Sequence, residues 1–249
     1  MNHDLYTENL GKTWGSFQAN ANLSLRFNAG ARHAIIGPNG AGKTTFINLL
    51  TGVLSPTTGS VFLGDQNITA LPQYQRVRLG MTRTFQINTL FAGLTVLESV
   101  LLVISERDGL HRHWFKPATA HHAAIEEAMV LLNTLQLVDQ AHELTRSLPY
   151  GKQRLLEIAL ALATKPKILL LDEPAAGIPT QESAELFAVI AALPKDVTVL
   201  FIEHDMNLVF QFADFITVLV GGQCFAQGTP EQIANDPRVK EVYLGESNV

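Results

Sequence analysis

A glycine-rich stretch at residues 37–45 constrains the fold of this chain more than any other feature of its sequence. It follows the pattern G-x-x-x-x-G-K-[ST] and consists of Gly37, Pro38, Asn39, Gly40, Ala41, Gly42, Lys43, Thr44 and Thr45. Glycines at this spacing let successive backbone N–H groups turn inward around an anion, which a Cβ atom would obstruct. The pattern predicts a phosphate-binding loop whose nine residues hold a nucleoside triphosphate.

The segments on either side of this loop support the interpretation. Residues 31–36 have the apolar character of a strand, and residues 45–50 that of a helix. A helix beginning at Lys43 places its positive dipole end at the phosphates, which Lys43 reaches with its amine, while the Thr44 hydroxyl is placed to bind Mg²⁺. A glycine-rich turn that matches by chance is the alternative, and the strand–loop–helix setting argues against it.

Composition narrows the class of protein. The 249 residues are 47% hydrophobic and 16% charged, which is typical of a globular α/β protein with a sizeable core. The net charge of −5 provides no broad basic field, so we expect no nucleic-acid partner. The single cysteine, Cys224, excludes an internal disulfide and fits a reducing compartment.

No membrane-spanning or targeting segment is expected. The polar start at residues 1–6 lacks the basic and apolar regions of a signal peptide. Apolar stretches such as residues 100–104 are far shorter than the roughly 18 residues needed to span a bilayer. We therefore expect a cytosolic protein whose membrane role, if it has one, comes through a partner.

The pattern changes twice along the chain. Residues 5–28 and 60–68 show the alternation of short strands, which predicts an antiparallel β layer around the nucleotide. The stretch from about 88 to 163 is predicted to be mostly helical, and within it residues 120–135 have apolar side chains at helical spacing. Four clustered histidines in this stretch, at 111, 113, 121 and 122, are either metal ligands or part of an exposed loop and helix cap. Because no carboxylate or cysteine joins them at ligand spacing, the second interpretation is favoured.

From residue 165 onward, strands and helices alternate. Apolar runs at 167–172, 197–202 and 215–220 predict central parallel strands buried on both faces. Asp172, Glu173 and His204 lie just where two of these strands end. Since open α/β sheets bind ligands beyond the carboxyl ends of their strands, these side chains are expected near the phosphates.

Four more features, in order, carry a resemblance to a family. Gln86 closes a short strand, residues 148–153 (LPYGKQ) open a helix, Asp172-Glu173-Pro174 ends an acidic strand, and His204 ends another. The whole chain thereby resembles the ATPases of ABC transporters. The resemblance implies one ABC ATPase domain, residues 1–249, with a P-loop NTPase α/β fold. In it, residues 1–87 and 164–249 form a mostly parallel central sheet with an antiparallel β layer, and residues 88–163 a helical subdomain.

The resemblance also implies roles for single residues. Asp172, Thr44 and Gln86 would hold Mg²⁺, and Glu173 would polarise the attacking water, or else act as an acid further from the reaction. His204 would contact the γ-phosphate, unless it is a satisfied core histidine. With Gln86, Glu173 and His204 form the expected catalytic set. Trp14 occupies the position on which adenine stacks, with a core tryptophan as the alternative and Phe17 as the substitute if the alignment is offset.

The helix N-terminus at 148–153 has a different implied role. In the family it points at the γ-phosphate bound by the opposite subunit, so Gly151 would bind nucleotide in trans within a head-to-tail dimer. Two departures stand out here: Pro149 replaces the usual serine, and Lys152 the usual glutamine. Residues 175–179, which follow Pro174, also lack the aspartate that the family usually carries there for contact across the dimer.

Within the family, the chain resembles bacterial importers of branched-chain and related amino acids. The segments that carry this are residues 148–159, 172–177 and 242–246, together with the insert at 106–118. Urea and amide importers share much of the pattern, and so does the ending of the cassette of lipopolysaccharide export. The expected partners are integral-membrane permeases, a second identical or paralogous ATPase subunit, and indirectly a solute-binding protein. The permeases are expected to dock near residues 87–101, in an apolar groove lined by Leu90, Phe91, Leu94 and Val96. The implied location is peripheral, on the cytoplasmic side of the inner membrane.

Two other classes of nucleotide-binding protein share the glycine-rich loop. A signalling GTPase would carry the base-reading motif N-K-x-D, which the sequence lacks. A non-transport cassette ATPase of translation or DNA repair usually has two cassettes, a long coiled coil or a basic surface. A single cassette of negative net charge favours transport over that alternative.

Overall fold

The computed structural model describes residues 4–84, 90–109 and 122–244. The chain divides into two compact units, each of which gathers segments that are distant in sequence. The first holds residues 1–83, 167–174 and 191–249, and the second holds residues 84–166 and 175–190. The second unit thus includes, beside the helical stretch predicted at 88–163, a helix that follows the Asp172-Glu173-Pro174 triplet.

A six-stranded sheet in the order β11-β10-β4-β9-β8-β7 forms the centre of the first unit. Its strands are β4 (Arg32–Ile36), β7 (Met81–Arg83), β8 (Ile168–Asp172), β9 (Thr198–Ile202), β10 (Phe215–Val220) and β11 (Gln223–Gly228). All neighbours are parallel except β10 and β11. Every residue of β4, β8 and β9 is buried, which explains their continuous apolar runs and confirms the predicted central strands.

A second, antiparallel sheet forms another layer of the same unit. Its strands are β1 (Leu5–Trp14), β2 (Phe17–Leu23), β3 (Arg26–Phe27), β5 (Thr58–Leu63) and β6 (Gln66–Asn67). In the order β2-β1-β5-β6, with β3 also on β1, the pairs β1–β2 and β5–β6 are hairpins, whereas β1 and β5 are distant in sequence. This is the antiparallel layer that the sequence predicted at 5–28 and 60–68.

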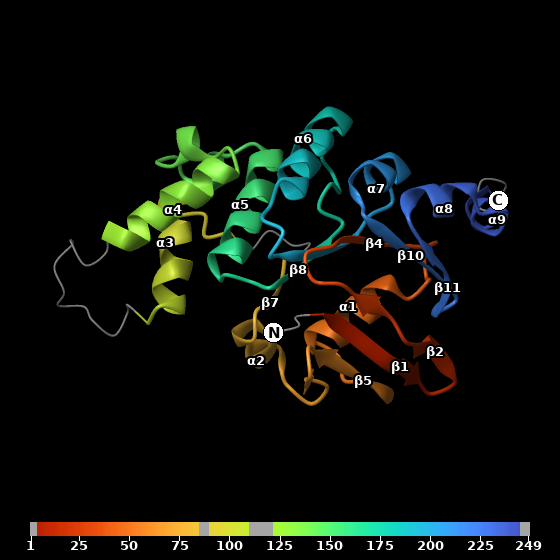
Figure 1. Ribbon diagram of the computed structural model, residues 1–249. Coiled ribbons are helices and arrows are strands. Elements are labelled where there is room, and N and C mark those ends of the chain that lie inside the picture. Colours follow the sequence, from red (N-terminus) through yellow and green to blue (C-terminus); the bar gives the residue numbers. More distant parts are fainter. Residues whose placement is uncertain (1–3, 85–89, 110–121, 245–249) are drawn as a thin grey trace. The chain divides into compact units, whose positions relative to one another are not determined.

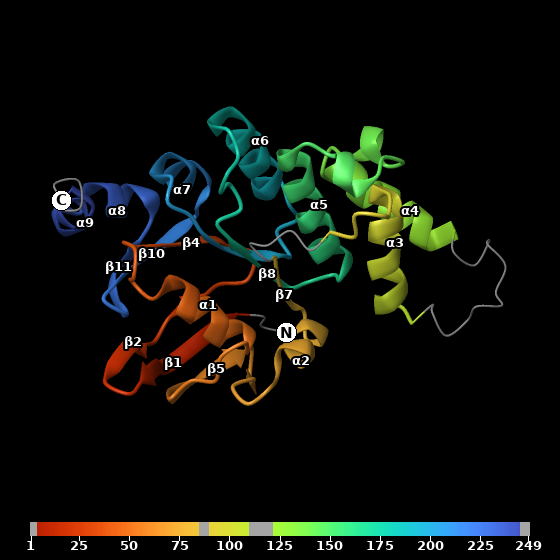
Figure 2. The same cartoon turned by 180° about the vertical axis from the view of Figure 1, so that it is seen from behind.

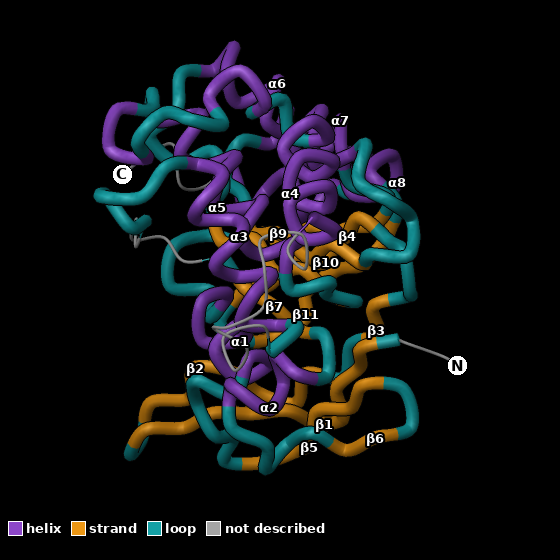
Figure 3. The backbone as a smooth tube through the Cα atoms, turned by 90° about the vertical axis from the view of Figure 1, so that its left-hand side faces the viewer, coloured by secondary structure: helices purple, strands orange, loops and turns teal. Residues whose placement is uncertain are grey.

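Helices separate and cover these sheets. They are α1 (Lys43–Thr51), α2 (Gln73–Arg78), α7 (Met206–Phe212), α8 (Pro230–Asn235) and α9 (Pro237–Leu244). Figure 1 and the view from behind in Figure 2 show α1 between the antiparallel layer and the strands β4 and β10, with α7 on the opposite face of those strands. The side view in Figure 3 shows the same two levels of strands with α1 between them.

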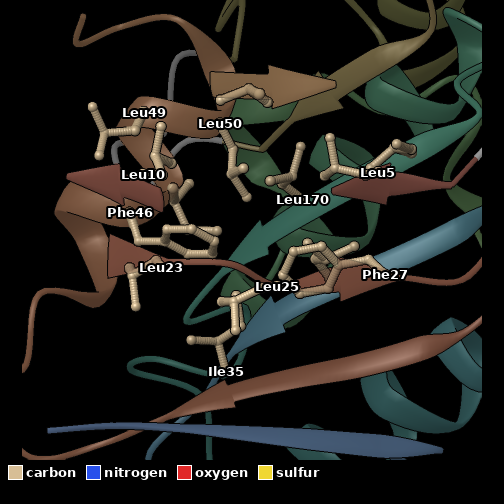
Figure 4. Close-up of a cluster of buried hydrophobic side chains, with 14 of the residues drawn as sticks. Leu5, Leu10, Leu23, Leu25, Phe27, Ile35, Phe46, Leu49, Leu50 and Leu170 are labelled. Atoms are coloured by element: carbon tan, nitrogen blue, oxygen red, sulfur yellow. The ribbon is translucent and has the colours of Figure 1, made fainter. Parts of the chain in front are cut away.

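The main core lies around α1. Figure 4 shows side chains from both sheets meeting those of α1, with Phe46 and Leu50 beside Leu10 and Leu170 among them. These four side chains have no solvent exposure. Burying one such side chain is worth about 1.5–3 kcal/mol. The core therefore fixes the helix that follows the glycine-rich loop, and with it the loop itself.

The second unit is helical. Its helices are α3 (Val96–Arg107), α4 (His122–Thr134), α5 (Tyr150–Ala163) and most of α6 (Thr180–Ala191), with short 3-10 helices at Val138–Gln140 and Thr145–Ser147. A capping box of Thr95 and Glu98 begins α3. At its other end Arg107 pairs with Glu127 of α4 and donates to the Ala163 carbonyl at the end of α5. This guanidinium therefore ties three helices together.

No helix in the described part of the chain is long and apolar enough to cross a membrane.

Arg76 of α2 has the largest fully buried side chain among the described residues, and it contacts the C-terminal end of α1. Its guanidinium donates to the carbonyls of Leu49 and Leu50 at the end of α1, and to those of Leu71 and Thr69. Its exposed fraction is 1%, and burial lowers its pKa to about 10. The four carbonyls compensate for part of the cost of burying this charge.

We predict that Arg76→Met lowers the free energy of unfolding by about 3 kcal/mol, because it leaves several buried carbonyls without a donor. Urea titration followed by circular dichroism measures the change. Arg78→Met is the matched control, since Arg78 is an exposed residue of the same helix. A control variant as unstable as Arg76→Met would show that the carbonyl contacts are not the cause.

His33 is a buried titratable group on β4. Its Nε2 lies 2.7 Å from the Thr217 hydroxyl on β10, and its ring packs against Phe27 and Phe215. Burial lowers the pKa of His33 from 6.5 to about 4. The unfolded chain therefore binds a proton on this residue more readily than the folded chain does.

Since the folded pKa lies below the unfolded one, stability is lost as the pH falls from about 6.5 toward 4. We predict a loss of about 2 kcal/mol from this group between pH 7 and pH 5. His33→Asn, which keeps a hydrogen-bonding amide but does not titrate, should reduce the pH dependence by that amount in urea titrations at the two pH values. The same pH dependence in wild type and variant would contradict the prediction.

Candidate functional site

The glycine-rich loop joins β4 to α1, as the sequence predicted. Gly40 and Gly42 have φ of +78° and +91°, in the left-handed region that other residues rarely adopt, and Gly42 is the N-cap of α1. A Cβ on Gly42 would lie 2.4 Å from the Ala19 carbonyl oxygen, and one on Gly37 would lie 2.2 Å from that of Leu219. Glycine is therefore required at both positions.

Lys43 lies folded against this loop. It is buried, and its Nζ donates to the carbonyls of Gly37 at 2.6 Å and Pro38 at 3.0 Å. The neighbouring Thr44 is exposed at the N-terminus of α1. The loop thus brings a cation, a hydroxyl and the positive end of a helix dipole together, an arrangement suited to an anion.

Asp172 is the last residue of β8, which belongs to the same six-stranded sheet as β4, the strand before the loop. Its exposed fraction is 3%, and its Oδ2 pairs with Arg83 of β7 at 2.5 Å. The other carboxylate oxygen, Oδ1, is buried without a hydrogen-bond partner among the described residues. A buried carboxylate oxygen in need of a partner fits the hard oxygen ligands of Mg²⁺.

Sequence reasoning missed Arg83. A basic residue in the short apolar stretch before Gln86 was the available signal. Its meaning depends on strand pairing, because β7 places Arg83 beside Leu170, two residues before Asp172 on the same face of β8.

Glu173 and His204 lie together after β8 and β9. The His204 Nε2 and Glu173 Oε1 atoms are 2.9 Å apart, and both side chains are partly exposed. Glu203 is buried, and its carboxylate accepts the backbone N–H of His204 at 3.1 Å. The structure therefore brings two of the three expected catalytic residues into direct contact, while Gln86 lies outside the described residues.

The backbone of Glu173 is strained. Its φ is +49°, a left-handed conformation that costs a residue with a Cβ about 1–2 kcal/mol. The backbone N–H of Glu173 nonetheless donates to the Ile202 carbonyl at 3.0 Å, which fixes the turn. Strained residues of this kind cluster at functional sites, where the surrounding structure holds them.

Trp14 and Phe17 form the end of the β1–β2 hairpin. They are cross-strand partners whose rings stack with centroids 6.5 Å apart and planes at 12°. Trp14 is 45% exposed and Phe17 is 63% exposed, so neither is a core residue. Both rings are available to stack on a planar ligand.

The segment 148–153 begins α5 in the helical unit. Pro149 is the N-cap, and Gly151 lies in the first turn of the helix. The Lys152 amine donates to the carbonyl of Gln136 at 2.9 Å, so this departure from the usual glutamine binds within its own unit. The Tyr150 hydroxyl accepts from Arg154, which also pairs with Glu157.

The expected docking segment is only partly as predicted. Leu90 and Leu94 are half-buried and Phe91 is 56% exposed, but Val96 has no exposure because it faces the interior of the helical unit. Val96 therefore cannot line a surface groove. Residues 85–89 lie outside the described part of the chain.

The histidines at 111, 113 and 121 also lie outside the described residues. His122 begins α4, and its Nδ1 lies 3.3 Å from a Glu126 carboxylate oxygen. In the described part of the chain, no group of three or more histidine, cysteine, aspartate or glutamate side chains is arranged to hold a metal ion.

Comparisons with known proteins agree with this geometry. The ABC transporter family model matches residues 20–176, and a model of branched-chain amino acid ATP-binding cassette transporters matches residues 223–248. The high-affinity branched-chain amino acid transport ATP-binding protein LivG of Escherichia coli K12 is 42% identical over 241 residues, 94% of each chain. BraF of Pseudomonas aeruginosa, which has the same description, is 44% identical over 227 residues, 86% of this chain and 87% of the relative.

Solved structures give the same fold. An ATP-binding cassette of an ABC transporter in its ADP conformation superposes with a TM-score of 0.84 at 33% identity, covering 98% of this chain and 99% of the other. A dimeric bacterial ABC transporter cassette superposes with a TM-score of 0.75 at 25% identity, covering 91% and 98%. The fold and the loop define a P-loop nucleotide-binding protein of the α/β class. The chain belongs to the ABC transporter family, as one of its ATP-binding cassette ATPases.

The strain at Glu173 leads to a prediction about stability. Glu173→Gly and Glu173→Ala both remove the carboxylate and its contact with His204, but only glycine adopts the left-handed backbone without cost. We predict that the glycine variant has a free energy of unfolding about 1 kcal/mol higher than the alanine variant, measured by urea titration. Equal stability of the two variants would show that the backbone at this position is not strained.

Proposed function

We propose that this chain is the ATPase subunit of a bacterial importer, and that its hydrolysis of ATP drives uptake of branched-chain or related amino acids through separate permease subunits. The observation that carries the proposal is the match along nearly the whole chain to branched-chain amino acid transport ATP-binding proteins, which extends to the C-terminal segment 223–248. The site supplies chemistry consistent with that role.

Nucleotide binding is assigned to the loop and the hairpin. The nine residues of loop 37–45 hold the phosphates, and Lys43 exchanges its contacts with loop carbonyls for the β- and γ-phosphates. Trp14 stacks on adenine, with Phe17 beside it. Because stacking tolerates any base, these rings favour a nucleotide without selecting ATP alone.

The metal is assigned to Thr44, Asp172 and Gln86. The unpartnered Oδ1 of Asp172 supports this, since the buried oxygen lacks a partner within the described residues. Mg²⁺ at this place would neutralise charge on the phosphates, and Asp172 would hold it through its hydration shell. Gln86 enters the assignment from the family pattern alone.

Glu173 is assigned to polarise the attacking water. Its carboxylate is partly exposed and contacts the His204 ring, so His204 orients it and also reaches toward the γ-phosphate. A general base of this kind contributes about 10²–10⁴-fold to the rate.

Coupling to transport requires two states of the cassette dimer: one closed by ATP, and one that reopens after hydrolysis. We assign Gly151 and the N-terminus of α5 to the nucleotide of a second cassette, identical or paralogous, in a head-to-tail dimer. The existence of a dimeric cassette of similar fold supports this arrangement. ATP contacts both subunits only in the closed dimer, which gives the differential affinity that a ligand-driven switch needs.

The subunit would act peripherally, on the cytoplasmic side of the membrane, with permeases and indirectly a solute-binding protein.

We predict that Glu173→Gln binds ATP with near wild-type affinity but hydrolyses it about 10²–10⁴-fold more slowly. Lys43→Ala is the matched control, because it should lose nucleotide binding itself. A fluorescent ATP analogue measures binding and phosphate release measures turnover. Mass in solution with and without Mg-ATP shows whether Glu173→Gln forms a dimer with itself. Wild-type turnover in Glu173→Gln would remove Glu173 from the catalytic role.

The transported solute needs its own test. Cells that lack this chain, supplied with wild type or Glu173→Gln, are compared for uptake of radiolabelled leucine and of urea. We expect leucine uptake to depend on wild type and to be lost with Glu173→Gln. Normal leucine uptake without the chain, together with lost urea uptake, would replace the amino acid assignment by the urea one.

A further inference from the structure

We propose that Arg83 is a positioning residue for the metal site: it holds Asp172 so that only Oδ1 is left to take part in Mg²⁺ binding, and it ties that carboxylate to the helix carrying Thr44. The inference rests on the Mg²⁺ assignment made above. It assigns a function to a residue outside the loop and outside the triplet that follows β8.

The contact with Asp172 follows from strand register. Arg83 lies beside Leu170 in the parallel pair β7–β8, so its side chain emerges on the face that Asp172 shares two residues further on. The Arg83 Nη2 atom donates to Asp172 Oδ2 at 2.5 Å, and the exposed fractions of the two side chains are only 10% and 1%. The ion pair therefore has little competition from water.

The pair makes the two carboxylate oxygens unequal. Oδ2 is occupied by the guanidinium, whereas Oδ1 is buried with no partner in the described part of the chain. A buried carboxylate oxygen without a donor is costly, so this orientation would be unfavourable unless a ligand completed it. Arg83 thus selects which oxygen serves the site and stops the carboxylate from rotating.

A second contact joins Arg83 to α1. Its Nη1 atom donates to Asn48 Oδ1 at 2.6 Å. Asn48 lies four residues after Thr44, so the two residues share one face of the helix. One guanidinium thereby bridges the strand that ends at Asp172 and the helix that begins at the proposed metal-binding hydroxyl.

Only arginine can make this bridge. Its guanidinium presents two terminal nitrogens in a rigid fork, here directed to two different oxygens, whereas lysine has one nitrogen on a flexible chain. Arg83→Lys keeps the positive charge but not the geometry. A positioning role and a purely electrostatic role therefore predict different results for this variant.

The test measures binding of Mn²⁺, as a spectroscopic substitute for Mg²⁺, to the ADP-bound protein by electron paramagnetic resonance. In parallel, fluorescent ADP is titrated in EDTA to give the affinity without metal. We expect Arg83→Lys to weaken Mn²⁺ binding about tenfold or more, as loss of a ligand's supporting contact typically does, while metal-free ADP affinity changes less than about threefold. Asn48→Ala, which removes only the helix contact, should weaken Mn²⁺ binding by a smaller factor.

Arg32→Lys is the matched control. Arg32 is another buried arginine of the same unit, but its guanidinium donates to the carbonyls of Leu193 and Val197, and within the described residues it contacts no carboxylate beside the nucleotide loop. It should lower stability and leave Mn²⁺ affinity unchanged. Thermal unfolding of each variant separates loss of fold from loss of metal.

Three results would overturn the inference. Unchanged Mn²⁺ affinity in Arg83→Lys would show that geometry at this residue does not matter. Tighter Mn²⁺ binding in Arg83→Gln would show that Arg83 acts only by repelling the metal. Equal losses of metal and metal-free ADP affinity would show a general structural role. If the wild-type protein with ADP binds no Mn²⁺ at all, the Mg²⁺ assignment itself fails, which distinguishes that failure from the failure of Arg83.

Discussion

The close packing of backbone against glycines in loop 37–42 is the constraint on which the rest of this structure depends. Gly37 lies against the Leu219 carbonyl at the end of β10, and Gly42 against the Ala19 carbonyl of β2. The loop is therefore held by both sheets of its unit, with no room for a Cβ on either side. Because α1 begins directly after it and is buried between the two sheets, the contacts that form the core also hold the proposed phosphate site.

Two buried charged groups near this loop, the Lys43 ammonium and the Asp172 carboxylate, have hydrogen-bond partners within the protein. Lys43 is satisfied by carbonyls of its own loop, and Asp172 by the guanidinium of Arg83. Both arrangements leave a group that a phosphate or a metal would complete: the ammonium can exchange its carbonyls, and one carboxylate oxygen has no partner in the described structure. The backbone of Glu173, next to Asp172, is also strained. Its left-handed conformation lowers the stability of the fold at a residue with a proposed catalytic role, as is common at functional sites.

Local sequence signals predicted much of this correctly. The apolar run 167–172 predicts a central strand because a strand buried on both faces is continuously apolar, and β8 spans Ile168–Asp172. The contact of Glu173 with His204 was foreseen only as proximity, from the rule that ligands bind at the carboxyl ends of strands. Val96 was placed on a surface that it does not reach, because an apolar residue near a predicted helix start has no sequence mark that separates a buried face from an exposed one.

The sequence by itself determined the glycine-rich loop between a strand and a helix, the succession of strands and helices along the chain, and the family, because these depend on spacing and on local conformational preference. Only the tertiary structure decided which side chains meet across elements: Arg83 with Asp172 and Asn48, Lys152 with the Gln136 carbonyl, and Arg76 with the end of α1. Such contacts join residues up to 89 positions apart. Their partners are set by strand register and helix packing, which no local pattern in the chain specifies.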